Sequence, residues 1–128
     1  MQDRPDASEL AQAVREFLEA EIIPTVADPR LRFRTLVAMN GLGILERELA
    51  LGPACVRREV ESLARLLGHE GPLPGDLAEL RSQARELNRE LARRIRAGNA
   101  PDGTLAHLVK TVADKLRVAS PRYLERYR

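Results

Sequence analysis

The apolar residues of this chain recur with helical spacing over most of its length, and this pattern predicts five helices. Apolar side chains return every three or four residues within each segment, as on the buried side of an amphipathic helix. No segment shows the two-residue alternation of a strand. The predicted helices span residues 6–24, 28–51, 53–67, 76–98 and 104–119. Because short connections favour antiparallel neighbours, we expect an all-α protein, an up-and-down bundle of four to five helices.

Residues that favour helix ends support these bounds. Asp6 is followed three residues later by Glu9, as in a capping box. Asp28 precedes a proline at the first helical position, and Asp76 precedes the fourth helix. A proline or a glycine follows each predicted helix: Pro24, Gly52–Pro53, Gly68, Gly98 and Ser120–Pro121. The Gly- and Pro-rich stretch 68–76 is expected to be a loop inside one domain, residues 1–128, with 119–128 as a C-terminal tail.

The predicted second helix is apolar on two sides. Its residues 35–45, TLVAMNGLGIL, carry no charge, although 31% of the chain is charged. One side holds Phe33, Leu36, Val37, Ile44 and Leu51, and the other holds Leu31, Ala38, Leu42, Leu45 and Leu49. A helix that is apolar all round is normally buried all round, so we expect this segment at the centre of the fold. A small bundle leaves part of such a helix uncovered, which favours a homodimer.

The composition narrows the class of protein. A chain of 128 residues with 44% hydrophobic residues has the size of one globular domain. The net charge is +2 with both signs interspersed, so nucleic-acid binding, which needs clustered basic residues, is not favoured. No run approaches the roughly 20 apolar residues of a membrane-spanning helix, and the charged N-terminus lacks the apolar region of a signal peptide. With Cys55 as the only cysteine no internal disulfide can form, and we expect a cytoplasmic protein.

Asn40 is the polar residue in the middle of the first apolar side. A buried amide without hydrogen-bond partners costs on the order of 1–3 kcal/mol. Asn40 is therefore expected to bond a polar group of a neighbouring helix, where it would fix the packing register, or else a water or a ligand. Gly41 and Gly43 each cost roughly 1 kcal/mol relative to alanine inside a helix. Their small size favours close approach of another helix, from the same chain or from a second copy.

The predicted fourth helix combines an apolar stripe with a row of arginines. The row consists of Arg81, Arg85, Arg89, Arg93 and Arg96, and Asn88 lies at its border with the apolar stripe. This flank is either a surface for an anion or acidic partner, or a solvated side balanced by Glu79, Glu86 and Glu90 at helical spacing. No aromatic residue that could stack on a nucleic-acid base stands beside it.

The histidines and the cysteine form no recognisable catalytic or metal-binding motif. His69 lies in the predicted loop and His107 on the polar side of the last predicted helix, with no metal-ligand spacing. Cys55 stands near the predicted start of the third helix, where its pKa could be lowered, but no histidine is near it in sequence. The sequence predicts no catalytic residue, metal or cofactor and favours a role other than that of an enzyme.

Four segments carry a resemblance to a known family: RPDASELAQAVREFLEAEIIP (4–24), LRFRTLVAMNGLGILERELALGP (31–53), LNRELARRIRAG (87–98) and HLVKTVADKLRVASPRYL (107–124). They resemble an uncharacterised family of small helical bacterial proteins. The motif positions are Asn40, Arg47, Glu48, Asn88, Arg94, Arg96, His107, Lys115, Pro121, Arg122 and Tyr123. Members are often encoded beside aminoglycoside-phosphotransferase-like kinases and acyl-CoA dehydrogenases. The resemblance therefore implies an accessory to acyl or hydroxy-acid catabolism, and it assigns no role to any residue.

Two functional hypotheses follow. The first is a protein-interaction or accessory protein, homodimeric and associated with such an enzyme, whose partner surface comprises Leu42, Leu45, Leu49, Arg122 and Tyr123. The alternative is a binding protein for an acyl or anionic metabolite, with a ligand site lined by Asn40, Asn88, Arg89 and Arg96.

Overall fold

The computed structural model describes residues 3–126, and all regular structure in that range is helical. The α-helices are α1 (Ala7–Phe17), α2 (Pro29–Leu67), α3 (Leu77–Arg96), α4 (Thr104–Ala119) and α5 (Pro121–Arg126). A π-helical turn, Leu18–Ile22, and a 3-10 turn, Ile23–Thr25, follow α1. The all-α bundle expected from the sequence is confirmed. The expected tail, 119–128, contains a short helix, because Pro121 is well placed to begin a helix even though it cannot continue α4.

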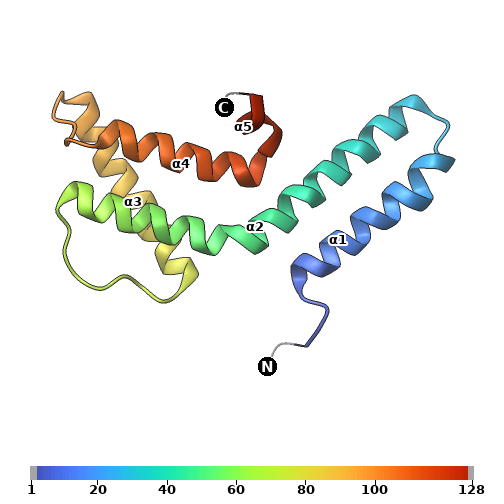
Figure 1. Cartoon of the computed structure of the whole chain (residues 1–128), viewed down its shortest axis with the longest axis horizontal. Coiled ribbons are helices and arrows are strands. Elements are labelled where there is room, and N and C mark those ends of the chain that lie inside the picture. Colours follow the sequence, from blue (N-terminus) through green and yellow to red (C-terminus); the bar gives the residue numbers. More distant parts are fainter. Residues whose placement is uncertain (1–2, 127–128) are drawn as a thin grey trace.

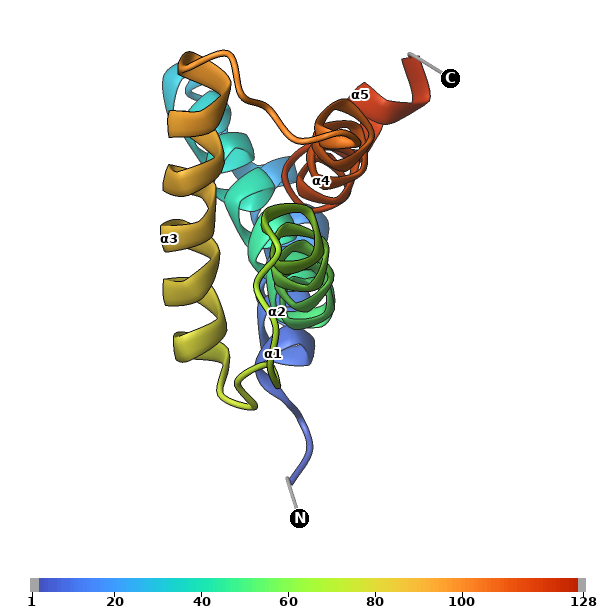
Figure 2. The same ribbon diagram turned by 90° about the vertical axis from the view of Figure 1, so that its left-hand side faces the viewer.

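Helix α2 is the central element, as the sequence predicts. Helices α1, α3 and α4 each pack on α2 and, within residues 3–126, not on one another. Figure 1 shows α1 alongside the first half of α2 and α4 alongside its second half. Figure 2 shows α3 lying across α2 rather than along it.

The prediction that a helix ends at Gly52–Pro53 is wrong. Helix α2 runs without interruption from Pro29 to Leu67, 39 residues, or about 58 Å at 1.5 Å per residue. Pro53 lacks the backbone N–H that would bond the carbonyl four residues earlier, and a proline in this position bends a helix rather than always ending it. Figure 1 shows this change of direction near the middle of α2.

The α-helix α1 ends at Phe17 and not at Pro24, because a π-helical turn and a 3-10 turn continue the chain to Thr25. Four other predicted helix ends are confirmed. Asp6 and Glu9 form a capping box at the start of α1. The Asp28 side chain accepts a hydrogen bond from the Arg30 amide, and Asp76 caps α3 in the same manner. Gly68 ends α2 with φ +74°, a left-handed conformation that a glycine adopts without strain.

The hydrophobic core lies between the second half of α2 and α3. The side chains of Val60 and Leu63 on α2 are completely buried. The remaining core residues are Leu67 from α2 and Leu80, Ala84, Leu87 and Leu91 from α3. These positions follow the three- and four-residue spacing of two facing helices.

The expectation that residues 35–45 form the buried centre of the fold is wrong. Leu36, Val37 and Leu45 are exposed, and 67% of Phe33 is exposed. The physical reason is that α3 and α4 pack mainly on the second half of α2, so α1 and the two turns that follow it are the main cover of the first half. Helix α1 and residues 29–51 of α2 therefore form an antiparallel hairpin, which we call the arm (Figure 1).

Candidate interaction surface

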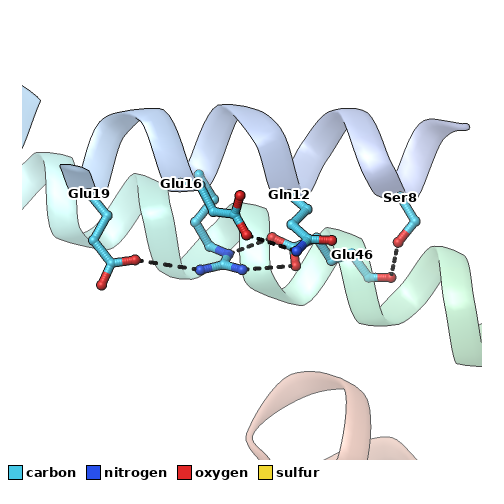
Figure 3. Close-up of polar contacts among 6 residues, drawn as sticks. Ser8, Gln12, Glu16, Glu19 and Glu46 are labelled. Atoms are coloured by element: carbon cyan, nitrogen blue, oxygen red, sulfur yellow. Dashed lines mark hydrogen bonds and ion pairs between the residues drawn. The ribbon is translucent and has the colours of Figure 1, made fainter. Parts of the chain in front are cut away.

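A polar contact joins the two helices of the arm. The Arg15 Nε donates a hydrogen bond to Glu46 Oε1 at 2.5 Å, and the Ser8 hydroxyl donates to the Glu46 carbonyl oxygen at 3.2 Å. Figure 3 shows these contacts on one side of the arm, together with the ion pair between Arg15 and Glu19. The hydrogen bond to Glu46 raises the pKa of Arg15. This side of α1 is polar, so the apolar side chains of α1 must point elsewhere.

Gly43 lies at the closest part of the arm. It is buried, and a β-carbon at this position would lie 3.3 Å from Arg47 Nη1 and 3.9 Å from Arg15 Cδ. Gly43 therefore makes room for the side chains that pass between α1 and α2. Gly41 is exposed, with no atom within 4 Å of such a β-carbon, so close packing inside the chain accounts for only one of the two glycines.

The arm exposes ten large apolar side chains, and six of them form one group. They are Leu10, Val14 and Phe17 from α1 and Leu31, Leu45 and Leu49 from α2, each 41–53% exposed. Because α1 and α2 run antiparallel and meet through Arg15, Gly43 and Glu46, helical spacing places all six on the same side of the arm. We call this surface the apolar hairpin face. It contains Leu45 and Leu49 of the partner surface predicted from the sequence, whereas the third leucine, Leu42, is partly buried beside it.

The other apolar side of the first half of α2 is also exposed. It carries Phe33, Leu36, Val37 and Leu51. Asn40 lies among them and is itself exposed. The expectation that Asn40 is buried is therefore wrong, and solvent reaches its amide.

Helix α4 has its apolar stripe on the outside. Leu105, Leu108, Val109 and Val112 lie on one side at helical spacing and are 37–76% exposed. Their helical spacing predicts the buried side of the helix, and for this helix that prediction is wrong. Thr104, His107 and Val118 are buried instead. We call the exposed residues the α4 stripe.

Polar contacts join α4 to α2 on the inner side of α4. His107 is only 4% exposed, and its Nδ1 lies 2.7 Å from the Ser62 hydroxyl. Its Nε2 is buried without a hydrogen-bond partner among the described residues. Burial lowers the pKa of His107, which keeps the imidazole neutral, while nearby Glu59 opposes this shift and Lys115 adds to it. A neutral histidine can thus occupy an interior position that an apolar residue usually fills.

Glu59 joins three helices. Its Oε1 accepts a hydrogen bond from Asn88 Nδ2 of α3 at 2.9 Å and from Lys115 Nζ of α4 at 3.2 Å. Asn88 also donates to the Ala84 carbonyl oxygen. Asn88 therefore acts in packing, and Glu59 was not singled out from the sequence because an isolated glutamate inside a charged pattern gives no distinguishing signal.

The four residues of the predicted ligand site lie apart. Asn40 is 19 positions before Glu59 on α2, about 28 Å along the helix axis, so it is far from Asn88. Arg89 and Arg96 are exposed on α3. The structure does not bring these residues together in one pocket.

Several positions that carry the family resemblance connect helices. Arg47 Nε donates to the Val118 carbonyl oxygen of α4 at 2.7 Å, and Glu48 accepts from Arg81 of α3 at 3.0 Å. Asn88, His107 and Lys115 make the contacts described above. These residues hold α3 and α4 on α2 and need no role in chemistry. Arg122 and Tyr123 lie exposed on α5, beyond the end of α4.

Residues 3–126 contain few side chains arranged for metal binding or catalysis. No group of three or more metal-ligating side chains is found there, and no helix in this range is long and apolar enough to cross a membrane. Because α2 continues through Pro53, Cys55 lies inside a helix and not at its start. Burial raises the pKa of its thiol, with a smaller opposing effect of Arg58, so Cys55 lacks the environment of an activated nucleophile.

A family model described as "Domain of unknown function (DUF6285)" matches residues 24–123. The match begins within the 3-10 turn and ends within α5. The chain belongs to this family. In this DUF6285 protein the matched region contains α2, α3 and α4, and α1 lies before it. No curated protein and no solved structure matches the chain.

Proposed function

We propose that this protein is a helical protein-interaction module that forms a homodimer through its apolar hairpin face. The observation that carries the proposal is the exposure of six large apolar side chains on one side of the arm. Contiguous exposed apolar patches mark interaction sites. The hairpin face is formed by regular helices joined by an ion pair, so it is a preformed surface.

The total accessible surface supports a partner of this kind. The chain exposes 9413 Å², whereas a compact monomer of 14.3 kDa exposes about 6,800 Å². The excess of about 2,600 Å² exceeds the roughly 800 Å² that each partner buries in a standard interface and falls in the range of extensive homodimers. A second copy of the chain could cover it.

The oligomeric state tests the proposal. We expect the wild type to have twice the chain mass by size-exclusion chromatography with light scattering at micromolar concentration. Leu45→Glu places a charge in the hairpin face and should give the chain mass, with unchanged helix content by circular dichroism. Ile95→Glu is the matched control, because Ile95 is an equally exposed apolar residue on α3, and it should stay dimeric. A wild type that is monomeric throughout would refute the proposal.

We further propose that the dimer acts in the bacterial cytoplasm beside an enzyme of acyl or hydroxy-acid catabolism, a phosphotransferase-like kinase or an acyl-CoA dehydrogenase. The family resemblance described from the sequence supports this part. Biolayer interferometry with each purified enzyme encoded beside the chain tests it. We expect saturable binding to one of them, and binding to neither would count against an accessory role.

A further inference from the structure

The α4 stripe is a second exposed apolar surface, on which no helix within residues 3–126 packs. Leu105, Leu108, Val109 and Val112 have the i, i+3, i+4, i+7 spacing with which a helix packs on another helix. Helix α1 packs on the other half of α2 and does not contact α4. The stripe is therefore accessible to a separate molecule.

A groove lies beside the α4 stripe, between α4 and α2. It has a volume of about 560 Å³, and Val109 and Ala113 contribute apolar side chains to it. Its basic residues are Arg58, Arg65, Lys110 and Arg117. Asp114 pairs with Arg58 and Arg117, whereas no ion pair within residues 3–126 engages Arg65 or Lys110. The lining also includes Glu59, which pairs with Lys115, and Glu61, which no ion pair within residues 3–126 engages. With four basic and three acidic residues, the groove has a small excess of positive charge next to an apolar surface.

Helix α1 has the complementary composition. Leu10, Val14 and Phe17 lie on its exposed apolar side. Its acidic residues are Glu9 and Glu16, and Glu19 and Glu21 follow in the π-helical turn. Its single basic residue, Arg15, is engaged by Glu46 and Glu19 of the same chain. An acidic amphipathic helix on an apolar groove with basic edges is an established mode of helix recognition.

We infer that the apolar hairpin face of one copy packs on the α4 stripe of a second copy, with the acidic side of α1 near Arg65 and Lys110. This inference rests on the proposed homodimer and names the surface that the hairpin face meets. In such a dimer the contact must be made twice: the hairpin face of each copy meets the α4 stripe of the other. The two identical interfaces are then related by a two-fold axis, which closes the assembly as a dimer. Two such interfaces would cover both exposed apolar surfaces and make use of the excess accessible area.

Complementation between two monomeric variants tests this arrangement. Leu45→Glu disrupts the hairpin face and Val109→Glu disrupts the α4 stripe, and each alone should raise the dimer dissociation constant by about tenfold or more. In an equimolar mixture the intact hairpin face of Val109→Glu can meet the intact stripe of Leu45→Glu. We therefore expect a mixed dimer, identified by native mass spectrometry with one variant isotopically labelled.

The controls separate this inference from the proposed function. Ile95→Glu should behave like the wild type in every assay, and circular dichroism should show the same helix content for all variants. If Val109→Glu dimerises like the wild type while Leu45→Glu is monomeric, the hairpin face meets a different surface and the inference is wrong, although the proposed dimer stands. If both variants are monomeric and the mixture forms no mixed dimer, the reciprocal contact is also wrong. A monomeric wild type refutes both.

Discussion

Single polar side chains hold α4 against α2 where apolar packing would be usual. The buried His107 contacts Ser62, and Glu59 binds both Asn88 and Lys115. Such contacts are directional, so they fix the rotation of α4 about its axis. That rotation is what leaves the α4 stripe on the outside.

The buried His107 should make folding stability depend on pH. Its pKa is lowered in the folded chain, so below its ordinary value of about 6.5 the unfolded chain binds a proton that the folded chain does not. We expect the free energy of unfolding, measured by urea denaturation, to be constant above that pH and to fall as the pH decreases towards 5. The slope cannot exceed about 1.4 kcal/mol per pH unit for one proton.

Two variants test whether His107 is responsible. His107→Gln removes the titrating group and should flatten the dependence between pH 5 and 7. His69 is the only other histidine; it is exposed and contacts Glu90 at 2.9 Å. His69→Gln should leave the dependence in place. A flat profile in the wild type would contradict the assignment.

At the scale of elements, the two halves of α2 have different roles. The second half forms the core with α3, whereas the first half belongs to the arm. Both halves of α2 carry leucines at helical spacing, so the sequence pattern does not distinguish the buried half from the exposed half. The stability of the fold should therefore depend on the second half.

Two leucine-to-alanine substitutions in α2 should separate these roles. Leu63 is completely buried, and Leu63→Ala should lower the free energy of unfolding by about 2–5 kcal/mol. Leu36 is exposed and lies outside both proposed contact surfaces, and Leu36→Ala should change it by no more than about 0.5 kcal/mol. Urea denaturation measures both. Equal losses would mean that the uncharged segment is buried after all.

The helical periodicity and the capping residues determine most of this fold locally, and so they could be predicted. Asp6, Asp28 and Asp76 begin helices because each side chain accepts a backbone hydrogen bond that the helix itself leaves open. The continuity of α2 at Pro53 and the rotation of α4 depend on contacts between distant residues. Helix α4 has an apolar side and a second side that contains Thr104 and His107. The sequence pattern alone favours the apolar side as the one that packs on α2, whereas the structure buries the other.

At the scale of the whole molecule, an extended arm attached to a small core is an unfavourable shape for a lone chain. Its excess surface is a cost that association can remove. The thermal stability of the wild type should therefore rise with protein concentration, because a dimer is stabilised by mass action.

Differential scanning calorimetry over a hundredfold range of concentration, roughly micromolar to sub-millimolar, checks this expectation. We expect the midpoint temperature of the wild type to increase with concentration and that of Leu45→Glu to stay constant. The midpoint temperature of this monomeric variant gives the stability of the fold without dimerisation. A concentration-independent midpoint in the wild type, together with a monomeric mass, would show that the arm is stable in isolation.

The bend at Pro53 has a consequence for the geometry of any assembly. One backbone hydrogen bond is missing at Pro53, and just before it Arg47 contacts Val118 of α4 and Glu48 contacts Arg81 of α3. The arm is about 35 Å long from this bend to its tip, so a small change of the bend angle would displace Phe17 and Leu31 by a large distance. The direction in which the arm reaches therefore depends on the bend and on these two contacts, and substitutions there could re-aim the arm without altering either contact surface.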